Sequence, residues 1–190
     1  MLEQSVEAYP NVPAWRAALA SDLCWLDRHG EATAILKKAA SDRFAHVLPA
    51  TADLTAFVNY AEAAFQTGDS GAAAILYGLI EPWADQVDWN GAVGFGHARL
   101  YLGLLALVLG DDERADEHLA FAWEFHDTND MPLWAARGHL GWAEALAARD
   151  DADGAEDHAR RALVVSQEHG YGAFEPRAAA LLAAQPAAET

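Results

Sequence analysis

Histidine and carboxylate side chains come first among the residues that could do chemistry, because together they bind metals or transfer protons. The sequence holds eight histidines. Two groups are dense enough to consider: Asp116, His118 and His126, and Glu156, Asp157 and His158. Neither group has the His-Glu-x-x-His spacing or the cysteine and histidine pairs of zinc sites. We interpret both groups as exposed histidines on the polar faces of acidic helices, and we predict no metal site and no cofactor.

Serines and glycine-rich loops are the next candidates. None of the serines lies in the Gly-x-Ser-x-Gly context that exposes a nucleophile at a sharp turn. The stretch Gly91–Gly96 has its glycines in the order GxxGxG, whereas dinucleotide-binding loops have GxGxxG after a strand, and we expect no strand before it. We interpret these glycines as allowing close packing or a bend at a helix start. No catalytic constellation is present, so we predict that the protein is not an enzyme.

The charge balance limits the partners. The formal net charge is −17, from 29 acidic and 12 basic residues. Such a surface repels nucleic-acid phosphates and anionic lipid, so we expect no nucleic-acid partner and no membrane partner. The longest apolar run, Leu100–Leu109, is about half of the roughly 20 residues that a membrane span needs. The single cysteine, Cys24, excludes an internal disulfide, and the first residues do not resemble a signal peptide. We therefore expect a cytoplasmic protein.

Apolar residues recur at helical spacing in pairs of segments joined by short turns. The clearest pair is residues 97–123, HARLYLGLLALVLGDDERADEHLAFAW, in which Gly-Asp-Asp separates two helices. Alanine and leucine dominate the composition, which favours helix over sheet. The spacing predicts helix hairpins over about residues 13–42, 51–83, 92–127 and 131–169, and a capping helix over 173–184.

The second helices of these pairs share a small–large–small pattern. Its first position follows each turn, at Ala32, Ala73, Ala115 and Ala155, with spacings of 41, 42 and 40 residues. The positions four residues on are Leu36, Tyr77, Leu119 and Ala159, and those three further on are Ala39, Ile80, Ala122 and Ala162. Each pair alone would expose an apolar face, so the pairs are expected to stack. We predict a single all-α domain over residues 1–190, a right-handed superhelical stack of about four helix hairpins with capping helices.

This pattern, with the Leu102-Gly103 pair and the turn glycine Gly110, resembles the tetratricopeptide repeat. The spacing exceeds that repeat's usual length of about 34 residues. It is closer to the irregular helical repeats in the C-terminal part of large bacterial signalling proteins, which couple a P-loop ATPase to a LuxR-type DNA-binding domain or an adenylate cyclase domain. The segments that carry the likeness are Tyr9–Ala20, Arg99–Ala106 and Met131–Arg137.

The resemblance implies a non-catalytic interaction or regulatory module of a signalling or transcriptional regulator. Its partner would be a protein or peptide, or other domains of a parent ATPase, and a homodimer is compatible with it. The alternative function is a sensor that binds a small ligand in the concave groove of the stack. The phosphate-binding GxxxxGK[ST] loop is missing, so no catalytic residue is carried over. Residues 2–9 resemble the end of a helix, which indicates either a capping segment or, as we prefer, a fragment of a longer protein.

The concave side of such a stack predicts a binding groove. Counting back from each turn gives the groove residues Asn59, Glu62, Gln66, His97, Tyr101, Arg137 and Glu144. Asparagine, tyrosine and arginine are residue types that bind peptide backbones, carboxylates and aromatic groups. The alternative is that several belong to a solvated face, and Tyr101 to the core.

The seven tryptophans fall into two classes. Those expected in the core, because they lie in apolar patterns, are Trp15, Trp25, Trp123, Trp134 and Trp142. Trp83 and Trp89 instead lie in the long connector before residue 97. If both are exposed, they mark a contact surface for a partner or a second copy.

Overall fold

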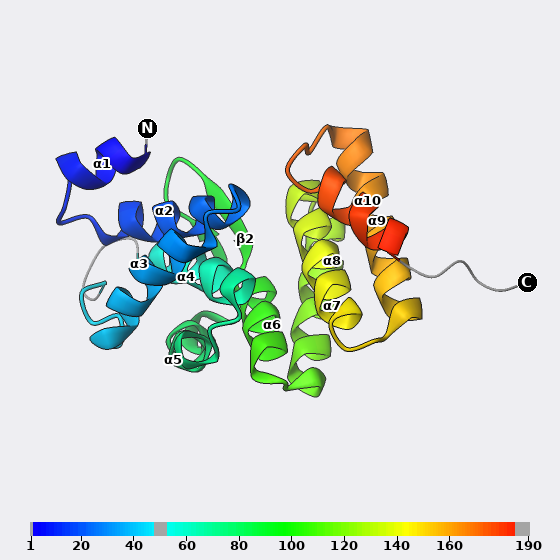
Figure 1. The fold of residues 1–190 in the computed structure, drawn as a ribbon, viewed down its shortest axis with the longest axis horizontal. Coiled ribbons are helices and arrows are strands. Elements are labelled where there is room, and N and C mark those ends of the chain that lie inside the picture. The colour runs from blue at the N-terminus through cyan, green and yellow to red at the C-terminus, as the bar shows by residue number, and fades with distance from the viewer. Residues whose placement is uncertain (1, 48–52, 185–190) are drawn as a thin grey trace, which may run out of the picture. The chain divides into compact units, whose positions relative to one another are not determined.

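The computed structural model describes residues 2–47 and 53–184, and this part of the chain is almost entirely helical (Figure 1). The prediction of a predominantly α-helical protein is confirmed. The helices are α1 (Leu2–Ala8), α2 (Pro13–Trp25), α3 (His29–Ser41), α4 (Asp53–Thr67), α5 (Ser70–Ile80), α6 (Ala98–Leu109), α7 (Asp112–Thr128), α8 (Pro132–Ala147), α9 (Ala152–His169) and α10 (Glu175–Ala184). A 3-10 helix, η1 (Glu81–Trp83), and two strands, β1 (Val87–Trp89) and β2 (Gly94–His97), lie between α5 and α6. The predicted start of the second helix pair, at residue 51, lies outside the described residues.

The chain divides into two compact units, residues 1–118 and 119–190, and each is described by itself. In the first unit, α2 packs against α3 and α4, and α4 packs against α5 and α6. In the second unit, α8 packs against α9, and α10 packs against both. In residues 2–47 and 53–184, no helix has the combined length and apolar character needed to cross a bilayer.

One turn geometry recurs between the helices of the pairs. A residue with positive φ ends each first helix: Asp27 (58°), Gly68 (66°), Gly110 (72°) and Asp150 (61°). The backbone N–H of the next residue then donates to the carbonyl five residues earlier, over 2.8–3.1 Å, in the pairs Arg28–Leu23, Asp69–Ala64, Asp111–Ala106 and Asp151–Leu146. In three of these turns that next residue is an aspartate whose carboxylate accepts a backbone N–H of the following helix. Such a carboxylate satisfies a donor that the helix start leaves open.

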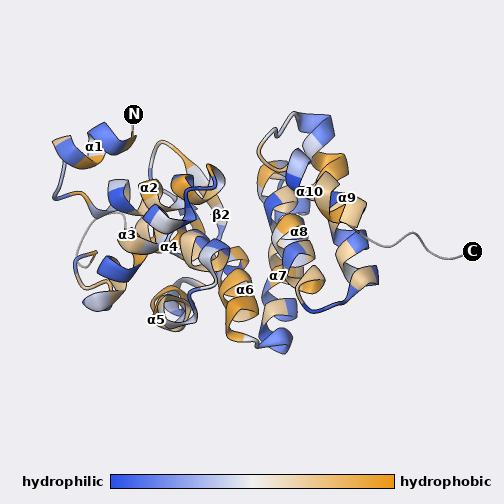
Figure 2. Ribbon diagram, in the orientation of Figure 1, coloured by the Kyte–Doolittle hydropathy of each residue, from blue (hydrophilic) through white to orange (hydrophobic). Residues whose placement is uncertain are grey.

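The small–large–small positions form the core of each pair. All twelve are at most 8% exposed. Helix α6 is hydrophobic along most of its length (Figure 2), and its residues from Leu100 to Leu107 are all buried. Because alanine and glycine have little or no side chain, they allow neighbouring helices to approach closely, and leucines fill the space between them.

The prediction that five tryptophans belong to the core is wrong for two of them. Trp15 is 38% exposed and Trp123 is 39% exposed, and the other three are half-buried. The buried stripe of α7 runs through Leu119, Ala122 and His126, and Trp123 lies one position off this stripe. The Arg161 guanidinium covers its ring at 5.6 Å instead.

The connector before α6 contains a β-hairpin that we did not predict. Strands β1 and β2 pair antiparallel, with Val87 opposite His97 and Asp88 opposite Gly96. Gly91 and Gly96 have φ of 91° and 82°, a region that favours glycine. A strand therefore does precede the glycine run, contrary to expectation. Its partner is the adjacent antiparallel strand, so the parallel sheet of a dinucleotide-binding fold is still not formed.

Candidate functional site

Five of the predicted groove residues lie in the first unit. Asn59, Glu62 and Gln66 are on α4, and His97 and Tyr101 are at the start of α6, which packs directly on α4. All but the half-buried Gln66 are buried, with exposures of 2–6%. The structure thus brings them to two adjacent helices as interior side chains.

Hydrogen bonds fix the orientation of these side chains. On α4, Asn59 Nδ2 donates to the Thr55 carbonyl (2.8 Å) and Gln66 Nε2 donates to Glu62 Oε1 (2.5 Å). On α6, the Tyr101 hydroxyl donates to the Phe95 carbonyl (2.7 Å). The backbone N–H of Arg99 donates to His97 Nδ1 (3.3 Å). Burial lowers the pKa of His97, and the charge of Arg99 lowers it further while Asp85 opposes the shift. A neutral His97 can accept the Arg99 N–H, so it caps the start of α6.

The remaining two groove residues are on α8, in the second unit. Arg137 is buried, at 2% exposed. Glu144 is half-buried, and one of its carboxylate oxygens lies 2.7 Å from the Arg177 guanidinium of α10. This ion pair connects the capping helix to the helix pair beneath it.

The β-hairpin carries a buried carboxylate that sequence analysis missed. Asp88 is 4% exposed, and its Oδ1 accepts the Thr55 hydroxyl of α4 over 2.9 Å. Its Oδ2 has no hydrogen-bond partner among the described residues. Burial raises the pKa of Asp88, and the hydrogen bond from Thr55 lowers it in part. The only signal in the sequence was an aspartate between two apolar residues of a strand.

Of the two tryptophans predicted to form a contact surface, Trp83 and Trp89, only Trp89 is exposed. Trp89 is 64% exposed, whereas Trp83 is half-buried in η1. Val87 and Val93 of the same hairpin are 40% and 51% exposed. Side chains alternate along a strand, so Val87 and Trp89 share one face of β1 while Asp88 points inward. We call Val87, Trp89 and Val93 the hairpin surface.

Gly94 supports the tryptophan of the hairpin surface. A Cβ added at Gly94 would lie 3.4 Å from the Trp89 ring. The ring therefore packs against the glycine of the opposite strand. This contact orients the indole although most of it faces solvent.

We expected His118 and His126 to lie on an exposed helix face, and this expectation is wrong. His118 and His126 are 8% and 1% exposed. They belong to the buried stripe of α7 because they follow Ala115 by three and eleven residues, which is helical spacing. His118 Nε2 lies 2.9 Å from the Tyr77 hydroxyl. Among the described residues, no three histidine, cysteine, aspartate or glutamate side chains are grouped so that they could hold a metal ion.

The second unit contains a histidine pair between α8 and α9. Nδ1 of His139 lies 2.9 Å from Nδ1 of His158, and the His158 ring stacks on Trp142 with centroids 4.2 Å apart. Burial lowers the pKa of His139 to about 3, with further contributions from His158 and Arg161. His139 is therefore neutral near pH 7, and one Nδ1 proton joins the two rings. Sequence analysis named His158 but not its partner, because 19 residues separate them.

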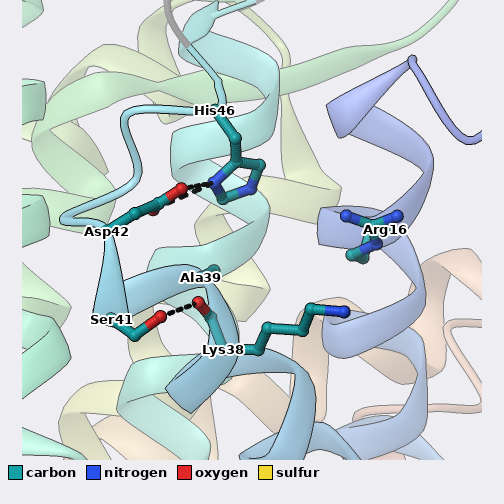
Figure 3. Close-up of a pocket in the computed structure, with 6 residues that line it drawn as sticks. All are labelled: Arg16, Lys38, Ala39, Ser41, Asp42 and His46. Atoms are coloured by element: carbon teal, nitrogen blue, oxygen red, sulfur yellow. Dashed lines mark hydrogen bonds and ion pairs between the residues drawn. The ribbon is translucent and has the colours of Figure 1, made fainter.

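A pocket of about 280 Å³ lies between α2, α3 and the turn after α3 (Figure 3). Its lining residues are Arg16, Lys38, Ala39, Ser41, Asp42 and His46. Nδ1 of His46 lies 3.1 and 3.2 Å from the two carboxylate oxygens of Asp42, so this nitrogen carries a proton and donates it. The pocket has no signature in the sequence, because no motif connects Arg16 with residues that follow it by more than twenty positions.

The one hydroxyl among the lining residues, that of Ser41, is not placed as a nucleophile. The Ser41 hydroxyl donates to the Lys38 carbonyl over 2.7 Å and does not contact His46. A serine nucleophile would need a hydrogen bond to the histidine that Asp42 orients. No protein-family model, curated protein or solved structure matches this chain.

Proposed function

We propose that this chain is a non-catalytic protein-interaction or regulatory module, built as a right-handed stack of helix hairpins of the tetratricopeptide type. Three observations support the proposal: the recurring turn, the burial of all twelve repeat positions, and the packing of α2 on α4 and of α4 on α6. Successive first helices pack in this order in stacked repeats. The module would act in the cytoplasm, within or beside a larger signalling protein.

The observation that carries the interaction role is the hairpin surface. Trp89 leaves 64% of its surface in solvent, and two exposed valines flank it. Tryptophan is enriched among the residues that contribute most to binding at protein interfaces. A chain with a net charge of −17 favours a basic partner. We therefore propose that the hairpin surface docks into an apolar pocket on a protein of positive charge.

The test is a comparison of three forms of the full chain as baits in an extract of the source cells. They are the wild type, Trp89→Ser, and Trp15→Ser as a matched control, because Trp15 is also exposed but lies on α2. We expect a basic protein to co-purify with the wild type and with Trp15→Ser and to be lost with Trp89→Ser. If Trp89→Ser retains the same partner, or if only a second copy of the chain is captured, the proposed surface is wrong.

The pocket between α2 and α3 favours a second function, the sensing of a small ligand. It is open to solvent between two helices and a turn, and its lining includes two cationic side chains, Arg16 and Lys38. A ligand that binds the folded state raises the unfolding temperature. Screening small organic anions by thermal unfolding tests this function without reference to the hairpin surface.

A further inference from the structure

We propose that the pocket between α2 and α3 binds the phosphate group of a small phosphomonoester. The proposal rests on the sensing function and is independent of the hairpin surface. It starts from two cations on opposite walls, Arg16 on α2 and Lys38 on α3. In Figure 3, Lys38 extends from α3 toward the helix that carries Arg16, and His46 reaches toward the same space from the turn.

Arg16 and Lys38 both lack a carboxylate partner. Neither Arg16 nor Lys38 forms an ion pair with another residue in the described part of the chain. Elsewhere arginines contact carboxylates, in the pairs Arg28–Glu31, Arg99–Asp85, Arg114–Asp111, Arg160–Glu156, Arg161–Asp157 and Arg177–Glu144. Lys37 and Arg43 likewise form no ion pair in the described residues, but only Arg16 and Lys38 of these four cations line the pocket. They leave positive charge for a ligand.

Lys38 does not have the simplest structural role open to a lysine at this position. A lysine near a helix C-terminus often binds the last carbonyl groups of the helix. Here three of those carbonyl groups already accept other donors. The Lys38 carbonyl accepts the Ser41 hydroxyl (2.7 Å). The Ala39 carbonyl accepts the Phe44 N–H (2.9 Å), and the Ala40 carbonyl accepts the Arg43 N–H (2.9 Å). The Lys38 ammonium is therefore not needed to cap α3, and it extends into the pocket instead.

The remaining wall of the pocket carries a negative charge. Asp42 brings a carboxylate that would repel an anion. Both of its oxygens face the Nδ1–H of His46, and the backbone N–H groups of Phe44 and Ala45 contribute as well. Burial acts to raise the pKa of Asp42, but these hydrogen bonds lower it. The carboxylate is thus held in the turn by hydrogen bonds that occupy its oxygens.

The turn also presents the second nitrogen of His46. Phe44 packs on Tyr60 with ring centroids 5.2 Å apart, and His46 Nε2 lies 3.5 Å from the Tyr60 hydroxyl. Arg43 and Phe44 have φ of 57° and 61°, the left-handed region, in this turn. This backbone course places the His46 ring at the wall of the pocket.

These charges select the ligand. Arg16 and Lys38 supply two positive charges, and the Asp42 carboxylate is already held by hydrogen bonds from His46 and from the backbone of the turn. A phosphomonoester carries about −1.5 to −2 charges near neutral pH, which matches the charge of these two cations, whereas a monocarboxylate leaves one cation unbalanced. The volume of about 280 Å³ fits a small molecule. The net charge of −17 disfavours a polyanion such as nucleic acid.

The test is calorimetric titration of the full chain with phenyl phosphate and, in parallel, with the dicarboxylate phthalate. The variants are Arg16→Gln, Lys38→Gln and, as a matched control, Lys37→Gln, which removes the same charge from the next residue outside the pocket. We expect saturable binding of phenyl phosphate that is weakened about tenfold or more by Arg16→Gln and by Lys38→Gln. Lys37→Gln should stay within about twofold of the wild type.

Each contrary outcome has a distinct meaning. Equal losses in Lys37→Gln and Lys38→Gln would show general charge attraction and overturn the pocket. Tighter binding of phthalate than of phenyl phosphate would overturn the phosphate assignment and leave the sensing function standing. If neither phenyl phosphate nor phthalate binds saturably, both the phosphate assignment and the sensing function are overturned. Lys38 is exposed, so Lys38→Gln is expected to fold even if Arg16→Gln does not, and thermal unfolding of each variant checks this.

Discussion

The hydrogen bond between Thr55 and Asp88 shows how one polar contact fixes the β-hairpin to the helices. Asp88 lies in β1 and Thr55 in α4, and the hydroxyl is the single partner of the buried carboxylate among the described residues. The hairpin has only two short strands, which contribute little stability without support. Its position on α4 therefore depends on this contact and on the packing of the residues around it.

Replacing Thr55 by valine keeps the shape of the side chain and removes the donor. We expect the free energy of unfolding to fall by about 1–3 kcal/mol at pH 7, because the carboxylate is left buried without a partner. Burial already raises the pKa of Asp88, so protonation in acid should relieve the penalty. Denaturant unfolding of wild type and variant at pH 7 and at pH 5 measures this. A loss that grows in acid would contradict the explanation.

The histidine pair predicts an acid sensitivity of the second unit. The pKa of His139 is about 3 in the folded protein and about 6.5 for an exposed histidine, so the unfolded state binds the extra proton between these values. Stability is therefore complete above about pH 6.5 and is lost as the pH falls, by at most about 1.4 kcal/mol per pH unit. His139→Gln should flatten this dependence. His169→Gln, at an exposed position, should leave it unchanged in pH-dependent unfolding measurements.

At the scale of elements, the recurring turn was the part of the fold that the sequence predicted best. In two of the turns a glycine is followed by an aspartate, and the aspartate precedes a buried alanine by four residues. The glycine is the left-handed residue, and the aspartate caps the next helix. The β-hairpin was not predictable in this way. Its strands have three and four residues, too few to show a strand period beside two tryptophans and three glycines.

For the candidate sites too, local sequence signals predicted some features, and contacts between distant residues could not be predicted. Counting from each turn assigned the groove residues to the first helix of each pair, but their burial depends on neighbours that are distant in sequence. The pocket was not predictable, because Arg16 and Lys38 approach only after α2 and α3 pair. The left-handed residues Arg43 and Phe44, which orient His46, have no glycine signal in the sequence.

The turn geometry predicts opposite effects for two substitutions. Asp150 has φ of 61° where two other turns have glycine, so Asp150→Gly should raise the free energy of unfolding by about 0.5–1 kcal/mol. Gly110 has φ of 72°, and Gly110→Ala should lower it by about 1–2 kcal/mol for the same reason. Chemical denaturation of both variants provides the measurement. Changes of the same sign would show that backbone strain does not control these turns.

At the scale of the whole molecule, the charge of −17 opposes compactness. Repulsion between exposed carboxylates is screened over about 10 Å at 0.1 M salt. We therefore expect the unfolding temperature to rise by a few degrees between about 0.01 and 0.15 M sodium chloride, as followed by circular dichroism. A fall over this range would mean that the ion pairs on the surface outweigh the repulsion.

The single cysteine gives the chain a built-in kinetic probe. Cys24 lies in α2 and is 1% exposed, and the second unit contains no cysteine. A thiol reagent can reach Cys24 only when the first unit opens, so the labelling rate reports the opening of that unit alone. Arg16 lies on the same helix. A phosphomonoester bound in the pocket should therefore slow labelling in proportion to its occupancy, without any label or tag being introduced.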